Sequence, residues 1–139
     1  MLNIKLEVDN FYKELESVEF YNYKLRTVNL KLEEIAVKLY EAEAIDYTKE
    51  NLGGSNAPKY SPKLGLMLKE EKLIEHALIW ERKINRCRRI LYQCSEDVKT
   101  ALIQKYVLKN SWEAVADQLN ISRPPLVRKI DSELKSVLQ

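Results

Sequence analysis

The segment "NSWEAVADQLNISRPPLVRKI", residues 110–130, places two adjacent prolines where the apolar spacing predicts the start of a helix. Proline lacks a backbone N–H and has a fixed φ. It therefore disrupts a helix interior but is accepted in the first turn, where N–H groups have no intrahelical acceptor. A residue before proline is pushed toward extended geometry. We therefore expect Arg123 and Pro124 at the edge of a helix that begins at Pro125, with a rigid first turn.

The residues before the prolines, "LNIS", predict a tight turn between two helices. Asn120 is one of the few non-glycine types that readily adopt a positive φ, and Ile121 can fold back as an apolar plug. Ala116 lies four residues before Asn120, where a small side chain lets two helices cross closely. Together with Leu126 and Ile130 on the next helix, this order of residues has the spacing of a helix-turn-helix.

A third helix is required, because "WEAVADQLN" is too short to be stable without packing. Ser95 can cap the preceding helix, "EDVKTALIQKYVLKN", and either Asn110 or Ser111 can cap the short one. We therefore expect a three-helix domain over residues 95–139.

The first 94 residues show a helical pattern with one interruption. All three glycines lie within "NLGGSNAPKYSPKLG", which predicts a connector near residues 51–63. Apolar residues before it recur at alternating steps of three and four, which predicts a long helix packed on a partner helix. The same spacing predicts a second long helix near residues 64–93. The columns of the first stripe are Val8, Leu15, Asn22, Asn29 and Ala36, and Phe11, Val18, Leu25, Leu32 and Leu39.

The first long helix would reach about 70 Å and the second about 45 Å, so a hairpin cannot cover the whole first stripe. Either the first helix breaks, or its excess apolar surface meets another chain. We favour a homo-oligomer, with a dimer as the favoured state. Asn22 and Asn29 would then either pair across the dimer or lie exposed where the helix bends.

Charge is unevenly distributed along the chain. The formal net charge is +2, yet residues 64–139 carry 14 basic against 10 acidic residues. The stretch "ERKINRCRRI" within them is either a second phosphate-contacting surface or the solvated side of the second long helix. A basic C-terminal part is a weak indication of a polyanionic partner.

Several classes of protein are disfavoured. The two cysteines lie seven residues apart, which indicates neither a disulfide framework nor a metal site. There is no phosphate loop and no nucleophile with a matched base, so we expect a non-enzyme without a cofactor. No apolar run approaches the roughly 18 residues of a membrane span, and acidic residues interrupt the N-terminal apolar stretch. We expect a cytoplasmic protein that makes no membrane contact.

If the double-proline helix enters a DNA groove, its first turns carry the residues that read bases. Arginine there can donate two hydrogen bonds to guanine O6 and N7, each good pair giving about 1–3 kcal/mol of discrimination. The residues expected to face base edges are Ser122, Arg123, Val127, Arg128 and Asp131. Those expected to contact phosphates are Lys109, Ser111, Lys129 and Lys135. The alternative is that all of these are ordinary solvated residues on a three-helix bundle.

The stretch "EDVKTALIQKYVLKNSWEAVADQLNISRPPLVRKIDSELKSVL" resembles the C-terminal part of phage-encoded late-gene transcriptional regulators of the ArpU and RinA type. Their DNA-binding end is similar to region 4 of bacterial sigma factors, which recognises a promoter element and touches RNA polymerase. The matching features are the helix with Tyr106, then "SWEAVADQLNIS", then a last helix with Leu134 and Leu138 in phase. This chain has one residue more than sigma region 4 after "LNIS", so the base contacts that the resemblance implies can shift by one position.

The sequence therefore predicts an all-α protein. A long helical hairpin or coiled coil over residues 1–94 would precede a helix-turn-helix DNA-binding domain over residues 95–139. The predicted function is that of a sequence-specific transcriptional regulator, an activator, that binds double-stranded DNA in the cytoplasm of a bacterial host cell. The alternatives are an RNA polymerase-binding adaptor, or a DNA packaging protein like the small terminase subunits. In those subunits the DNA-binding unit usually comes first, and its C-terminal position here counts against packaging.

Overall fold

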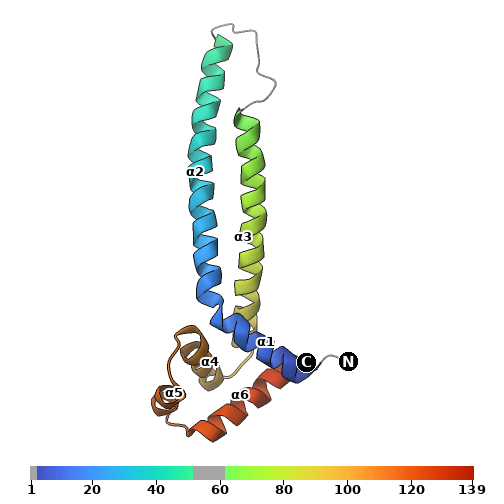
Figure 1. Cartoon of the computed structure of the whole chain (residues 1–139), viewed down its shortest axis with the longest axis vertical. Helices are drawn as coiled ribbons and strands as arrows, with labels where there is room; N and C mark the ends of the chain where they lie inside the picture. Colours follow the sequence, from blue (N-terminus) through green and yellow to red (C-terminus); the bar gives the residue numbers. More distant parts are fainter. Residues whose placement is uncertain (1–2, 52–61) are drawn as a thin grey trace. The chain divides into compact units, whose positions relative to one another are not determined.

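The computed structural model describes residues 3–51 and 62–139, and every regular element within them is helical (Figure 1). The elements are α1 (Ile4–Glu16), α2 (Val18–Asn51), α3 (Pro62–Tyr92), α4 (Glu96–Leu102), the π-helical turn η1 (Ile103–Val107), α5 (Trp112–Leu119) and α6 (Arg123–Val137). The predicted all-α class is confirmed. The predicted connector lies, apart from its ends, outside the described residues. Among the described helices, none combines the length and the apolar character that crossing a membrane requires.

The chain forms two compact units. Unit 1 joins the residues up to Asn22 to residues 82–139, and unit 2 consists of residues 23–81. The predicted division after residue 94 therefore does not coincide with the units, because α1 and the last turns of α3 fold together with the C-terminal helices.

A break at Ser17 separates α1 from α2. The Ser17 hydroxyl donates a hydrogen bond to the Lys13 carbonyl at 3.0 Å, and the Ser17 N–H donates to the carbonyls of Lys13 and Glu14. A serine side chain bonded back to the preceding turn competes with regular helix continuation. Of the two alternatives for the long N-terminal stripe, the structure thus shows a broken helix.

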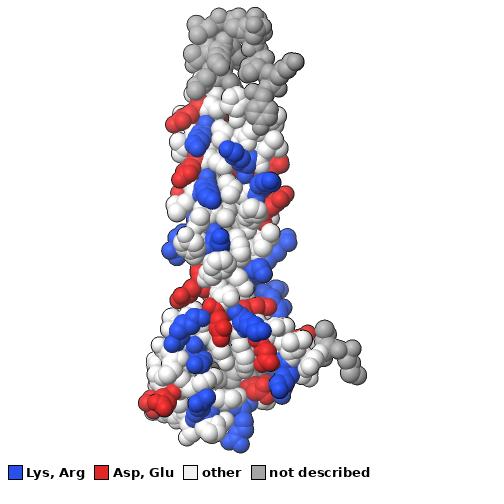
Figure 2. Space-filling view, viewed as in Figure 1, with Lys and Arg blue, Asp and Glu red and all other residues white. Residues whose placement is uncertain are grey.

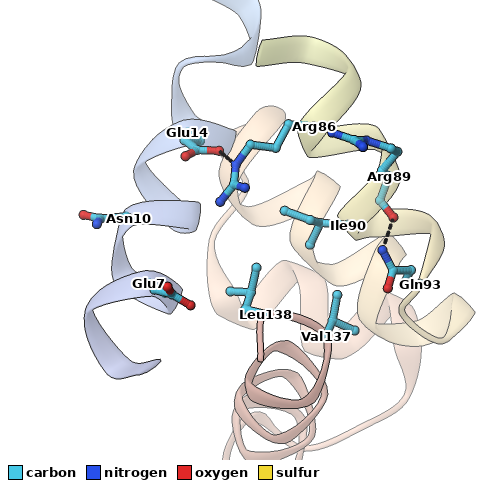
Figure 3. Close-up of a pocket in the computed structure, with 9 residues that line it drawn as sticks. All are labelled: Glu7, Asn10, Glu14, Arg86, Arg89, Ile90, Gln93, Val137 and Leu138. Atoms are coloured by element: carbon cyan, nitrogen blue, oxygen red, sulfur yellow. Dashed lines mark hydrogen bonds and ion pairs between the residues drawn. The ribbon is translucent and has the colours of Figure 1, made fainter. Parts of the chain in front are cut away.

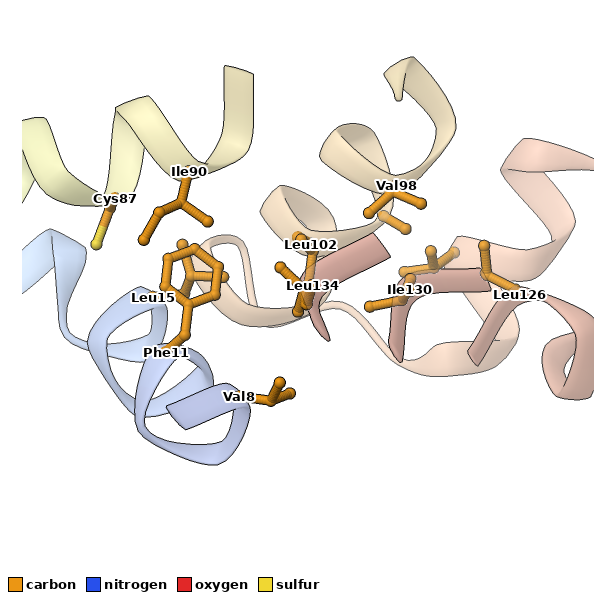
Figure 4. Packing of buried hydrophobic residues seen from close by; sticks show 12 residues of the cluster. Val8, Phe11, Leu15, Cys87, Ile90, Val98, Leu102, Leu126, Ile130 and Leu134 are labelled. Atoms are coloured by element: carbon orange, nitrogen blue, oxygen red, sulfur yellow. The ribbon is translucent and has the colours of Figure 1, made fainter. Parts of the chain in front are cut away.

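The break allows α1 to contribute to the core of unit 1. Val8, Phe11 and Leu15 are buried, and they belong to the same apolar cluster as the buried residues of the C-terminal helices (Figure 4). The other members of this cluster are Cys87, Ile90, Val98, Ala101, Leu102, Val115, Leu126, Ile130 and Leu134. The apolar stripe of residues 8–15 is therefore covered within the chain and needs no second chain there.

Two predicted helix caps have different outcomes. Ser111, rather than Asn110, caps α5, since its Oγ accepts a hydrogen bond from the Ala114 N–H at 3.2 Å. Ser95 occupies the N-cap position of α4 but makes no capping bond. Its N–H and hydroxyl instead donate to the two carboxylate oxygens of Glu133, at 2.7 and 2.8 Å, which ties the start of α4 to α6.

Unit 2 is built from the parts of α2 and α3 that pack on each other. Val28 and Ile35 of α2 and Ala77 of α3 are buried. The half-buried residues in the same seam are Leu25, Leu32, Leu39, Leu73 and Trp80. These positions keep the predicted steps of three and four. The seam contains the predicted column with Leu25, Leu32 and Leu39, but not the column with Asn22, Asn29 and Ala36. Asn22 and Asn29 belong to the other column and are exposed.

The role of α1 can be tested through Phe11, which is fully buried. We expect Phe11→Ala to lower the free energy of unfolding by about 3–5 kcal/mol, because it removes a large side chain and leaves a cavity. Leu6→Ala, on the exposed side of the same helix, should change it by no more than about 0.5 kcal/mol. Urea unfolding followed by circular dichroism measures both, and similar losses for the two variants would contradict this assignment of the core.

Candidate nucleic-acid interface

The turn between α5 and α6 has the predicted geometry. Asn120 lies in the left-handed region, with φ 55° and ψ 35°. The N–H of Asn120 donates to the Asp117 carbonyl at 3.3 Å, and the N–H of Ile121 donates to the Ala116 carbonyl at 3.2 Å. This pair of bonds is a Schellman motif, which closes the C-terminus of a helix on itself. Ile121 is half-buried and packs against the core, as predicted for an apolar plug.

The double-proline helix begins two residues earlier than predicted. Ser122 is the N-cap, and α6 starts at Arg123 rather than at Pro125. The first helical hydrogen bond runs from the Leu126 N–H to the Ser122 carbonyl at 3.1 Å and encloses both prolines. Neither proline needs to donate there, and closure of this turn outweighs the bias of pre-proline residues toward extended geometry.

The first turn of α6 is not covered by the rest of unit 1. Ser122, Arg123, Pro124 and Pro125 are all exposed, whereas the next residue, Leu126, is fully buried. Figure 1 shows this end of α6 beside α5 and away from the end of α3. A rigid and accessible helix start is therefore available to a partner.

The arginines predicted to read bases are exposed, and each is held by a neighbour. Arg128 Nε donates a hydrogen bond to the Pro124 carbonyl at 3.3 Å. The Arg123 guanidinium lies 5.9 Å from the centre of the Trp112 ring, and Lys105 Nζ lies 5.5 Å from the same ring. Cation–π contacts at exposed sites contribute about 0.5–1 kcal/mol, enough to bias a side chain without immobilising it.

Trp112 therefore has a part in the site that its sequence position did not reveal. It is the first residue of α5 and is half-buried against the core. Trp112 and Arg123 are brought together by the turn between α5 and α6. The local sequence pattern therefore could not predict their contact.

Of the other predicted base readers, Val127 is 38% exposed on the side of α6. Asp131 is half-buried, and its carboxylate pairs with Lys135 Nζ at 2.9 Å, one helical turn away. These residues share α6 with Arg128. Ser132 is exposed on the same helix and was not predicted.

The residues predicted to contact phosphates all have partners within the chain. Lys109 Nζ donates to the Glu16 carbonyl at 2.8 Å, and Lys129 Nζ lies 3.5 Å from a carboxylate oxygen of Asp97. The partner of Lys135 is Asp131, and Ser111 is engaged as the cap of α5. Exposed pairs such as those of Lys129 and Lys135 contribute only about 0–1 kcal/mol, so a phosphate could replace the carboxylates at small cost.

The basic stretch of α3 lies away from the start of α6. Figure 1 shows the two at different ends of unit 1. Arg86 Nε pairs with Glu14 at 3.1 Å, and Lys83 Nζ lies 5.4 Å from the centre of the Tyr21 ring. The stretch lies before residue 95, and residues 95–139 themselves hold seven basic and six acidic residues. On the face that Figure 2 shows, basic and acidic side chains are interspersed.

A pocket of about 470 Å³ lies beside this stretch in unit 1 (Figure 3). Arg86 and Arg89 of α3 form one wall, and Glu14 of α1 faces them. The remaining lining residues are Glu7, Asn10, Ile90, Gln93, Val137 and Leu138. Arg86 and Glu14 pair with each other across this pocket, so each charge already has a partner within the chain. Neither here nor elsewhere in the described ranges, 3–51 and 62–139, does a group of three or more His, Cys, Asp or Glu side chains lie where it could hold a metal ion.

An aromatic stack connects α1 to the start of α5. The Tyr12 and Tyr106 rings stack with centres 4.6 Å apart, and the Tyr106 ring meets the Trp112 ring edge-on at 6.3 Å. Burial, followed by the neighbouring Tyr106, raises the pKa of Tyr12 well above its ordinary value. Burial also raises the pKa of Tyr106, with Glu16 and Asp9 adding to the effect. The surface around Trp112 thus continues into the packed core.

No protein-family model matches this chain, and neither a curated protein nor a solved structure is significantly similar to it.

The left-handed turn gives a direct test at Asn120. Asn120→Ala should lower the free energy of unfolding by about 1–2 kcal/mol, because a Cβ without a compensating polar side chain disfavours the left-handed region. Asn120→Gly should be close to neutral, since glycine adopts this region freely. Chemical denaturation of the three proteins measures the difference. If the glycine variant lost as much as the alanine variant, the asparagine side chain rather than the backbone geometry would be the cause.

Stability should also fall at alkaline pH. Burial, with the Glu14 carboxylate adding to it, raises the pKa of the Cys87 thiol from 9.0 to about 11, and the pKa of Tyr12 is raised from 10.0. Between the unfolded and folded pKa values the folded state binds more protons, so its stability decreases as pH rises. We expect the free energy of unfolding to decline above about pH 9, and Tyr12→Phe to make the decline shallower above about pH 10. Equal slopes for the two proteins would contradict this.

Proposed function

We propose that this protein is a sequence-specific DNA-binding transcriptional regulator, an activator, that reads base edges in the major groove with the start of α6. The observation that carries the proposal is the exposed, proline-stiffened first turn that follows a closed left-handed turn at Asn120. Helix-turn-helix proteins present the N-terminal residues of their second helix to bases in this way. A three-helix bundle whose surface residues are merely solvated would not need an exposed, proline-stiffened helix start.

Arg128 is the best candidate for reading a base. Its side chain lies on the exposed side of α6, and its one hydrogen bond among the described residues is to the Pro124 carbonyl. Turning away from that carbonyl would free the guanidinium for the two acceptors of a guanine. Arg123, resting on Trp112, would contribute from the first position of the helix. Val127 would offer an apolar contact of the kind that thymine methyl groups accept.

Affinity from phosphates should be modest. The C-terminal helices are nearly neutral, and Lys129 and Lys135 are paired with carboxylates. Each neutralised phosphate contributes about −0.9 to the slope of log affinity against log salt. A shallow but non-zero slope is therefore expected, with specificity depending more on α6 than on general charge.

The activator role and the bacterial host cytoplasm rest on the resemblance of residues 96–138 to phage late-gene regulators and to sigma region 4. That resemblance also makes RNA polymerase a candidate partner. A second candidate function is therefore a polymerase-binding adaptor, and the near-neutral charge of residues 95–139 favours it over a general DNA binder. Capture of polymerase without measurable DNA affinity at low salt would select the adaptor. A ring of eight or more subunits in solution would instead support a packaging protein.

The decisive experiment is selection of bound sequences from random double-stranded DNA with the full chain. Affinity for the selected site is then measured over a range of salt concentrations. Enrichment of a defined sequence with a measurable slope supports the proposal. No enrichment together with a slope near zero would overturn it, since no phosphate would be neutralised.

On the selected site, Arg128→Ala should weaken binding by about 5- to 150-fold, which corresponds to the loss of one bidentate base contact of about 1–3 kcal/mol. Binding to random DNA should change much less. Lys72→Ala, at an exposed lysine of α3 outside the basic stretch, serves as the control and should leave both affinities unchanged. Fluorescence anisotropy measures the affinities of the wild type and both variants for the two DNAs. Equal losses of Arg128→Ala on specific and random DNA would make Arg128 a phosphate contact instead.

A further inference from the structure

The side of α2 that faces away from its seam with α3 carries a second apolar row. Tyr23, Leu30 and Val37 follow one another at steps of seven residues and are 61, 55 and 58% exposed. At about 100° per residue, Leu30 lies about 140–160° around the helix from the buried Val28 and Ile35. A regular row of large apolar side chains opposite the packed side of a helix is typical of an interaction surface.

This row, Tyr23–Leu30–Val37, is symmetric about its centre. Tyr23 precedes Leu30 by seven residues and Val37 follows it by seven. If a second copy lies antiparallel with its Leu30 against Leu30, Tyr23 meets the partner's Val37, and Val37 meets the partner's Tyr23. A twofold interface is self-complementary in this way, because the same surface is used on both copies.

The charged neighbours of the row favour the antiparallel alignment. Arg26 lies four residues before Leu30 and Glu33 three residues after it, so both fall on the same side of the row, about 40° and 60° from Leu30. In the antiparallel pair, Arg26 and the partner's Glu33 lie on one side of the interface at nearly equal heights, about 6 and 4.5 Å from the twofold axis. Opposite charges would therefore pair twice.

The parallel alignment is disfavoured by the same residues. In a parallel pair, each side of the row meets the opposite side of the partner's row, so Glu33 would lie beside the partner's Glu34. Like charges at close range repel. Within the described parts of this chain, none of the ion pairs involves Arg26 or Glu33. Both charges are therefore available to a second copy.

We propose that two copies of this chain associate through α2, antiparallel, with Leu30 on the twofold axis and Arg26 paired with the partner's Glu33. The occupant of the row is thus a second copy of the chain. The inference is independent of DNA binding, because neither the row nor its charges belong to α6.

A second exposed row on α3 is less suited to self-association. It consists of Leu64, Met67, Ile74 and Leu78. Glu71 lies within it at the matching step, so burial of this row would also remove an acidic side chain from water, at a cost in free energy. The α3 row provides a matched control in the experiment.

The test is sedimentation equilibrium of the full chain without DNA, with helical content checked by circular dichroism. Wild type should form a dimer. Arg26→Glu and Glu33→Arg should each weaken it by about tenfold or more, because each places like charges together twice. The double variant carrying both substitutions should restore the wild-type dissociation constant, since the pairs form again with their charges exchanged. Ile74→Glu, on α3, should have no effect.

Cysteine cross-linking distinguishes the alignments. Leu30→Cys should form a disulfide with its own counterpart on mild oxidation, whereas Tyr23→Cys should not, because the two Tyr23 positions lie about 21 Å apart along the antiparallel pair. Cys87 is buried and Cys94 half-buried, and wild type oxidised in parallel controls for both. A monomeric wild type, failure of the exchanged pair to restore the dimer, dissociation by Ile74→Glu, or cross-linking of Tyr23→Cys to itself would each overturn the proposal.

Discussion

The packing of α1 against the C-terminal helices is the interaction on which the rest of unit 1 depends. Two of the C-terminal helices are short, since α4 has seven residues and α5 has eight. Helices of this length are marginal in water without tertiary contacts. Phe11 and Leu15 are fully buried in the cluster that also contains Leu102, Leu126 and Leu134, so α1 serves as a fourth helix. The break at Ser17 makes this possible, because a straight continuation of α2 would carry these side chains along the seam with α3 instead.

The surface proposed to meet DNA follows from that core. With Leu126, Ile130 and Leu134 held inside, the opposite side of α6 must face solvent. The left-handed turn at Asn120 then sets where the helix starts, and the prolines fix the first turn at little cost because no N–H is needed there. Trp112 contacts both the core and the exposed start of α6. Its ring meets Tyr106 of the packed interior and also lies under the guanidinium of Arg123.

Electrostatics limit how this surface can work. The basic excess of the C-terminal half resides on the last turns of α3 rather than on the helix-turn-helix, whose lysines are largely paired. A protein of this kind gains little from long-range attraction to a polyanion. In the proposed DNA complex, affinity would have to come mainly from close complementarity at α6.

The sequence by itself determined the features that depend on neighbouring residues. Steps of three and four marked the helices, and Asn120 before Ile121 marked the turn. The sequence offered both Asn110 and Ser111 as caps of α5, and the structure selected Ser111. These signals are local, because backbone preference and side-chain periodicity act within a few residues. Only the tertiary structure decided that the N-terminal stripe ends at Ser17 and folds onto the C-terminal helices, that Ser95 bonds Glu133 instead of capping α4, and that Arg123 rests on Trp112. Each of these contacts joins residues that are distant in the sequence or that lie on either side of a turn. The periodicity of a sequence does not indicate which helix surfaces pack together.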